Sequence, residues 1–400
     1  MNRKGSVLLT MLAMAVSIFV MLGVEHVREQ AKNSFSNTVS GVDLVVGART
    51  GNINLLLYSI FRMGAPTNNI SWQSYQDIQN DRKVAWTIPI SLGDSHKGYR
   101  VIGTNSDYFT HYHYGQKQPL GFEHGQAFKQ VFDVVLGYEV AKALNYQLGD
   151  KLVLSHGVGA TSFTHHDENP FTVVGILKPT GTPVDQSLHV SLQGLEALHY
   201  ANLKLAPEGD KKRHIQLEQL ANIQPKSITA FMVGLKSKMA VFQIQRRINN
   251  AKSEPLMAIL PGVALSELWQ SMAVMENALR LISVLVFISA LLGLSAMLLT
   301  SIRERYQEIH LLRAIGASPL FLFWFIELEA MLITIVSTAL GASALYGTLV
   351  LAQDYILTHY GVSLDTTIVS ADMLPILGVV YLFTFIAAIP PAVNAFNKAR

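Results

Sequence analysis

The chain has 400 residues, of which 50% are hydrophobic and 15% charged, against about 25% charged in ordinary globular proteins. This apolar excess excludes an intrinsically disordered chain, and a net charge of +3 is too small to indicate a nucleic-acid-binding protein. The sequence has no cysteine, which excludes disulfide scaffolds, thiolate metal sites and cysteine nucleophiles.

The apolar residues are concentrated in four uncharged blocks at residues 7–24, 281–302, 330–353 and 373–397. About 20 apolar residues suffice to cross a membrane, since a helix rises about 1.5 Å per residue and the hydrocarbon core is about 30 Å thick. Four spans are therefore predicted. Four buried core helices would each need a polar face, which these blocks lack. A cleaved signal peptide is disfavoured because no small-residue cleavage site follows the first block.

Lysine and arginine in the short segments predict the orientation of the spans. They occur before the first block, between the second and third, and after the fourth: Arg3, Lys4, Arg303, Arg305, Arg313, Lys398 and Arg400. The loop at residues 354–372 carries three Asp and no Lys or Arg. Both termini are therefore predicted to be cytoplasmic, with residues 25–277 on the outer side.

The outer segment predicts an α+β domain with helical stalks at residues 25–38 and 265–280. Predicted strands are 86–92, 99–103, 151–155, 171–177, 188–191 and 228–235, and predicted helices are 71–81, 137–148, 192–200 and 238–252. The full predicted order is a cytoplasmic end with the first span (1–24), the outer domain (25–277), the second span (278–301), a cytoplasmic helix (302–318), the third span (319–353), an outer loop (354–372), the fourth span (373–394) and a cytoplasmic tail (395–400).

The segment between the second and third spans predicts an amphipathic helix. Ile302, Ile309 and Leu312 fall roughly on one face at helical spacing. Gly316 is expected to end this helix, and Pro319 to begin the next one. The pattern alone leaves two interpretations open, a helix resting on lipid head groups or a docking surface for a cytoplasmic partner.

The string Arg-x-x-Glu-Ile-x-x-Leu-Arg-Ala-x-Gly-Ala, from Arg305 to Ala317, resembles the signature of ABC transporter permeases of the MacB, LolC/LolE and FtsX group. The one-plus-three span order and the strings at residues 43–48 and 171–177 are also similar, so the resemblance covers nearly the whole chain. One departure from MacB itself is that the sequence has no Gly-x-x-x-x-Gly-Lys-Ser/Thr motif, so the ATPase is expected in a separate subunit.

The resemblance implies a bacterial inner-membrane permease of the mechanotransmission type, itself not an enzyme. It implies a cytoplasmic ABC ATPase partner that holds ATP and Mg²⁺, a permease homodimer or a pair with a related permease, and a periplasmic adaptor or substrate protein. The residues that it assigns to ATPase coupling are Arg305, Glu308, Ile309, Leu312, Arg313, Gly316 and Ala317. The expected function is export or extraction of a substrate on the outer side of the membrane. The alternatives are an FtsX-like regulator of a periplasmic partner and a zinc-linked transport system.

Two further sets of residues are candidate sites. Glu327 and Glu329 lie shortly before the apolar part of the third span, where these permeases often carry a Glu, and are expected at the membrane interface. The other set is histidine: His111 and His113, whose i, i+2 spacing would place both on one face of a strand, and His165 and His166 in a polar loop tip. Zinc binding by these histidines is the less favoured interpretation, since no third ligand is identified.

Overall fold

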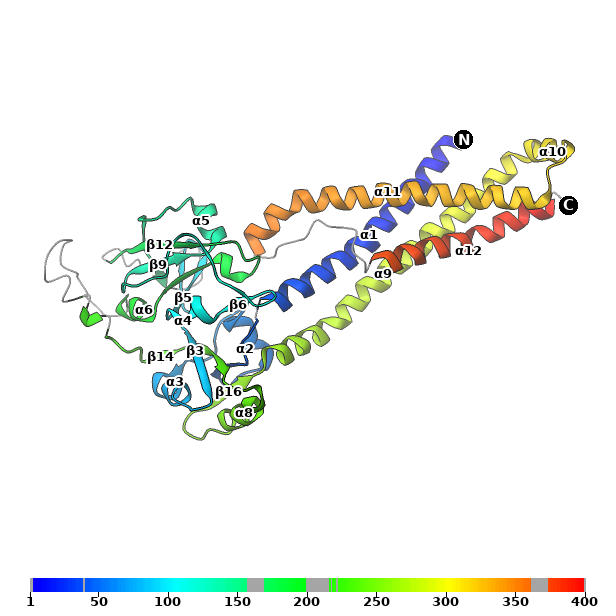
Figure 1. The fold of residues 1–400 in the computed structure, drawn as a ribbon. Helices are drawn as coiled ribbons and strands as arrows, with labels where there is room; N and C mark the ends of the chain where they lie inside the picture. Colours follow the sequence, from blue (N-terminus) through cyan, green and yellow to red (C-terminus); the bar gives the residue numbers. More distant parts are fainter. Residues whose placement is uncertain are drawn as a thin grey trace. The chain divides into compact units, whose positions relative to one another are not determined.

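The structure, a computed structural model, describes residues 3–38, 40–156, 169–198, 216, 218–220, 222–360 and 373–398. It divides into two compact units (Figure 1). The first unit comprises Met1–Ala31, Met272–Tyr355 and Leu364–Arg400, and the second comprises Lys32–Ser271 and Ile356–Ser363.

The first unit is built from long apolar helices. They are α1 (Arg3–Asn37), α9 (Pro261–Glu304), α11 (Pro319–Tyr360) and α12 (Leu374–Lys398), with the short helix α10 (Tyr306–Ala314) between α9 and α11. All four long helices are long and apolar enough to cross a membrane. Only 28% to 39% of their most apolar windows is buried, so most apolar side chains face outward. Such helices would be unstable in water, and the prediction of four spans, one N-terminal and three C-terminal, is confirmed.

Small residues let the long helices approach closely. A Cβ added to Gly341 of α11 would lie 2.7 Å from the Ala15 carbonyl oxygen of α1. One turn away, Ser337 Oγ donates a hydrogen bond to the Met11 carbonyl oxygen at 3.0 Å. This is how helices associate in a membrane, where packing and interhelical hydrogen bonds replace the hydrophobic effect. Both described chain ends point toward the end of the unit that carries α10 (Figure 1).

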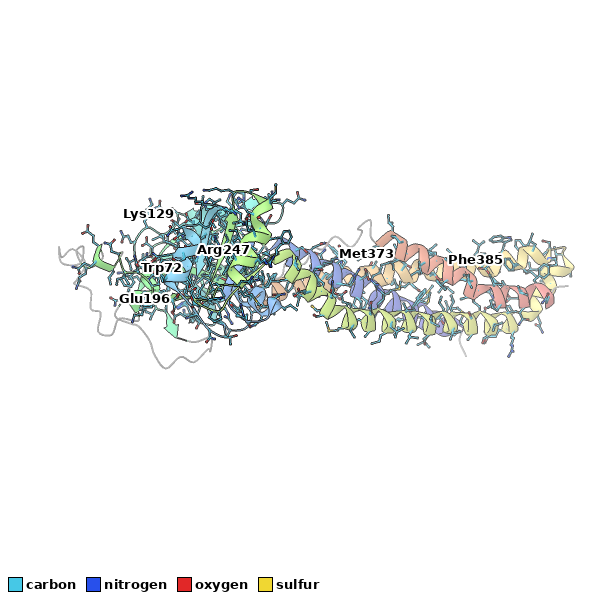
Figure 2. The ribbon with its side chains drawn as sticks, turned by 90° about the horizontal axis from the view of Figure 1, so that it is seen from below. Trp72, Lys129, Glu196, Arg247, Met373 and Phe385 are labelled. Atoms are coloured by element: carbon cyan, nitrogen blue, oxygen red, sulfur yellow. The ribbon has the colours of Figure 1, made fainter. Side chains whose placement is uncertain are left out.

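The first sheet of the second unit is antiparallel, in the order β16-β1-β15-β3. Its strands are β16 (Leu256–Ile259), β1 (Leu44–Ala48), β15 (Ala230–Leu235) and β3 (Val84–Ile90). Alternate residues point to opposite faces: Val45 packs with α2 (Asn52–Ser59), whereas Val46 packs with α3 (Trp72–Gln79) and α8 (Val241–Asn249). On that second face, Arg247 of α8 forms an ion pair with Asp81, which follows α3 (Figure 2 labels Arg247 and Trp72).

The second sheet is mixed, in the order β10-β12-β9-β13-β5-β4-β11, with β8 also pairing with β12. Its strands are β4 (Asp94–His96), β5 (Tyr99–Thr104), β8 (Phe122–Gly125), β9 (Asp133–Leu136), β10 (Lys151–Leu152), β11 (Ser155–His156), β12 (Phe171–Leu177) and β13 (Ser187–Ser191). The remaining elements are α4 (Asp107–His111), α5 (Tyr138–Leu144), α6 (Leu192–Leu198), the 3-10 turns η1 (Pro183–Gln186) and η2 (Lys238–Ala240), and the strand pairs β2 (Ile70–Ser71) with β14 (Ser227–Ile228) and β6 (His113–Tyr114) with β7 (Gln118–Pro119). An antiparallel bridge between Ser91 and Gly103 joins the two sheets.

Most predicted elements of the outer domain are confirmed, and two are corrected. The predicted strand at 151–155 splits, because Lys151–Leu152 pairs with β12 while Ser155–His156 pairs with β4. The predicted helix at 137–148 ends at Asn145, which adopts the left-handed conformation (φ 54) that commonly closes a helix. Both predicted stalks are helical, since α1 continues to Asn37 and α9 begins at Pro261.

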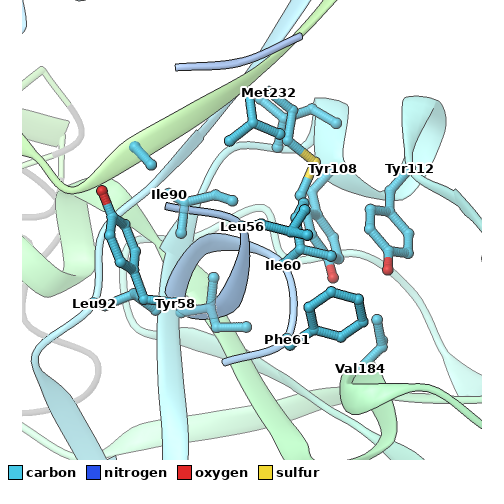
Figure 3. Packing of buried hydrophobic residues seen from close by; sticks show 14 of the residues in the cluster. Leu56, Tyr58, Ile60, Phe61, Ile90, Leu92, Tyr108, Tyr112, Val184 and Met232 are labelled. Atoms are coloured by element: carbon cyan, nitrogen blue, oxygen red, sulfur yellow. The ribbon is translucent and has the colours of Figure 1, made fainter. Parts of the chain in front are cut away.

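A buried polar cluster lies beside the aromatic part of the core (Figure 3 shows Tyr108 and Tyr112). The Arg62 guanidinium donates to the Ser59 carbonyl oxygen and, at 3.4 Å, to the Tyr108 hydroxyl. Tyr112 donates to the Thr38 carbonyl oxygen at 2.5 Å. Burial, together with the charge of Arg62, lowers the pKa of His189 to about 3, so this histidine is neutral at physiological pH.

Asp185 makes the stability of this unit depend on pH. Burial raises its pKa from 3.8 to about 6, although its carboxylate accepts hydrogen bonds from Thr180 N at 2.9 Å and Gly181 N at 2.7 Å. The pKa of Asp185 is thus higher in the folded state than in the unfolded state. Its contribution to the free energy of unfolding is therefore complete below pH 3.8 and is lost as pH rises through about 6. We expect the free energy of unfolding to fall by about 3 kcal/mol across this range, because a tenfold change in an acid dissociation constant corresponds to about 1.4 kcal/mol.

In Asp185→Asn this pH dependence should disappear, because the amide does not titrate. The measurement is urea unfolding of the full chain in detergent between about pH 4 and pH 7, followed by tryptophan fluorescence. If the free energy of unfolding changed equally with pH in both proteins, the pH dependence could not be assigned to Asp185.

Candidate functional site: the elbow between α9 and α11

The elbow is the segment in which the chain leaves α9, forms α10 and enters α11. Helix α9 ends at Glu304 and α10 begins at Tyr306, so Arg305 lies in the break between them. Gly316 has φ +106, and Ala317 N donates to the Leu312 carbonyl oxygen at 3.0 Å. This is the pattern of a Schellman motif, which needs a residue tolerant of positive φ and ends α10 at the predicted glycine. Pro319 then begins α11, as predicted.

Arg305 connects the break to both neighbouring helices. Its Nη1 lies 3.5 Å from Glu329 Oε2 of α11, and its Nε lies 3.8 Å from Glu308 Oε2 of α10. The guanidinium carbon is also 5.9 Å from the centroid of the Phe325 ring. Only 19% of the Arg305 side chain and 21% of the Glu329 side chain are exposed, whereas the Glu308 side chain is largely exposed. The pair with Glu329 is therefore the less solvent-screened of the two.

A small cavity of about 80 Å³ at this break is lined by Arg305, Glu308 and Glu329 and by apolar residues from four helices. The apolar lining includes Ile302 of α9, Leu312 of α10, Leu322 of α11 and Ala395 of α12. Leu312, which the sequence places on the apolar face of the predicted helix, thus also belongs to the packing of the elbow.

The outward side of α10 carries two apolar side chains that the sequence reasoning did not single out as a pair. Leu311 is 64% exposed and Ile315 is 77% exposed. They are four residues apart and therefore lie next to each other on one helical face. The sequence pattern does not indicate Leu311, because at helical spacing it lies off the face formed by Ile302, Ile309 and Leu312. The side chains of Ile309 and Arg313 lie outside the described part of the chain.

The two membrane glutamates occupy different environments. Glu329 faces Arg305. Glu327 is buried in the first unit, and within the described part of the chain neither of its carboxylate oxygens has a hydrogen-bond partner. The structure therefore brings Arg305, Glu308 and Glu329 together and leaves Glu327 apart from them.

The prediction that His111 and His113 share one face of a strand is wrong. His111 is the last residue of α4, and His113 is the first residue of β6. The His111 ring stacks on Trp86 at 5.1 Å, and His113 Nδ1 lies 2.7 Å from the His111 carbonyl oxygen. His165 and His166 lie outside the described residues. Among the residues that are described, no group of three or more His, Cys, Asp or Glu is placed to hold a metal ion.

Comparison with known proteins gives the family. The model of the MacB-like periplasmic core domain matches residues 7–251, and the model of the FtsX-like permease C-terminal domain matches residues 280–399. The chain therefore belongs to the MacB-like and FtsX-like ABC permeases: it is a multi-pass membrane protein with a periplasmic or extracellular domain, in a family whose permeases act with an ATPase partner.

Two solved structures are similar to parts of the chain. The periplasmic region of MacB from Actinobacillus actinomycetemcomitans matches at 11% identity and a TM-score of 0.36, covering 58% of this chain and 94% of that one. The extracellular domain of the noncanonic ABC-type transporter YknZ from Gram-positive bacteria matches at 12% identity and a TM-score of 0.31, covering 55% and 98%. No curated protein matches the sequence.

Proposed function

We propose that this chain is a permease subunit in which ATP hydrolysis by a separate cytoplasmic subunit moves the outer domain. The movement would export or extract a substrate on the outer side of the membrane. The permease would act as a homodimer, or paired with a related permease, and ATP and Mg²⁺ would bind in the ATPase. Both termini and α10 would be cytoplasmic, in agreement with the lysine and arginine distribution.

The elbow is the observation that carries the proposal. An apolar pair, Leu311 and Ile315, is exposed on a short helix whose start is tied to α11 by Arg305. Helix α9 runs from Pro261 to Glu304 without a break, so a force on α10 enters one continuous helix that crosses the membrane. A docking face followed directly by a rigid helix is an arrangement suited to transmitting movement.

Sealed membrane vesicles test the function and the orientation together. The ABC ATPase subunit that acts with this permease would be purified and added to vesicles containing the chain. We expect it to bind inside-out vesicles, which present the cytoplasmic face, and to hydrolyse ATP faster there than in solution. Right-side-out vesicles should neither bind nor stimulate it. Binding to the right-side-out vesicles, or to neither kind, would overturn the proposal.

A further inference from the structure

A groove of about 300 Å³ lies between α1, α9 and α12 in the first unit. Its walls are apolar and come from all three helices: Met21, Val24, Val284, Pro375, Ile376 and Val379. Glu25 and Arg280 stand at its polar end. The groove therefore has apolar walls and one charged end, called the charged rim below, at Glu25 and Arg280.

The groove lies at the boundary between the membrane and the outer solution. The uncharged block of α1 ends at Val24, directly before Glu25, and the block of α9 begins at Leu281, directly after Arg280. Helix α12 begins at Leu374, one residue before Pro375 of the groove. Three polar–apolar boundaries thus meet at one level. Because the periplasmic or extracellular domain connects α1 to α9, this is the outer boundary.

The charged rim contains equal numbers of positive and negative groups. Glu25 Oε2 accepts a hydrogen bond from Arg280 Nη2 at 3.2 Å, and Glu25 also pairs with Arg28. Arg28 Nη1 in turn lies 3.7 Å from Glu276 Oε2. About half of the Arg280 side chain is exposed, and the other three are more buried. These four groups together carry no net charge, Glu29 adds a further negative charge near Arg28, and Arg280 is the most accessible of the four.

We propose that this groove is a binding site for one zwitterionic glycerophospholipid of the outer leaflet. An acyl chain would lie along the apolar walls, and the phosphate would accept hydrogen bonds from Arg280. The ammonium group would lie near the carboxylate of Glu25. A balanced ion pair complements a headgroup that carries both charges, whereas an anionic headgroup would meet no surplus of positive charge. The site is independent of the proposed coupling to an ATPase.

Native mass spectrometry of the full chain, extracted from nanodiscs of equal phosphatidylethanolamine and phosphatidylglycerol, tests the proposal. We expect one retained phosphatidylethanolamine per chain. Val284→Trp should fill the groove, displace the acyl chain from its apolar walls and lower its retention about tenfold. Val286→Trp is the matched control, because Val286 is on the same helix, similarly exposed and outside the groove lining. It should leave retention unchanged.

The headgroup contact has its own variant, which changes only the rim. Glu25→Gln should abolish the preference for phosphatidylethanolamine over phosphatidylglycerol, because it removes the carboxylate that faces the ammonium group and leaves Arg280 to bind the phosphate that both lipids carry. Equal retention of both lipids by the unmodified chain would overturn the proposal, as would an equal loss in both tryptophan variants, which indicates ordinary boundary lipid. A change of oligomeric state in Val284→Trp alone would assign the groove to a second copy instead.

Discussion

Replacing Leu311 and Ile315 together by alanine is expected to weaken binding of the ATPase subunit at least about tenfold. Each buried aliphatic side chain contributes roughly 1.5–3 kcal/mol, and about 1.4 kcal/mol is a factor of ten in affinity. Both side chains face outward, so their loss leaves no cavity within the chain. The measurement is co-purification of the ATPase with the full chain, followed by ATP hydrolysis in nanodiscs.

Two other variants separate docking from its alternatives. Leu332→Ala, at an equally exposed position within α11, makes the same chemical change away from α10 and should leave ATPase binding unchanged. Glu308→Lys should weaken docking through charge mismatch if α10 binds a protein. If α10 rests on anionic head groups instead, the lysine should strengthen membrane attachment and leave the complex intact. Normal ATPase recovery in the alanine pair and in Glu308→Lys would remove the docking role.

Local chemistry explains which parts of the elbow the sequence predicts. Gly316 and Pro319 mark the end of one helix and the start of the next through backbone requirements that each residue carries by itself. The pairing of Arg305 with Glu329 depends on the reversal of chain direction after α10, which residue spacing does not describe. Treating residues 302–318 as one helix also hides the break at Arg305, where α9 ends and α10 begins. Spacing counted across that break from Ile302 therefore does not identify Leu311 and Ile315 as the exposed pair.

In the outer domain too, some elements are predictable from local sequence and others depend on how the chain packs. Strand β12 is predictable from its β-branched residues and the turn that follows it. Strands β1 and β9 are buried at every position, so they lack the apolar–polar alternation by which a strand is recognised. The interpretation of His111 and His113 assumes a strand across both residues, but the chain leaves a helix at Tyr112 between them.

Breaking the pair between Arg305 and Glu329 is expected to uncouple the elbow without preventing the chain from folding. Either Arg305→Ala or Glu329→Ala leaves one charge in a partly buried position. Removing one partner of a fully buried pair costs about 3–5 kcal/mol, and about 2 kcal/mol is expected here because both side chains keep some exposure. Glu308→Ala should cost less than about 1 kcal/mol, since an exposed ion pair contributes little.

The informative experiment is a double-mutant cycle that includes the reversed pair Arg305→Glu with Glu329→Arg. Thermal unfolding of the full chain in detergent reports the stability of the pair, and stimulation of the ATPase reports coupling. If the pair holds α10 in position, each single reversal should lose stimulation, and the double reversal should recover part of it. Since neither residue belongs to the outward face of α10, ATPase binding itself should change much less than stimulation. Additive effects in the double reversal would show that Arg305 and Glu329 act separately, and the elbow would then lose its role in transmitting movement.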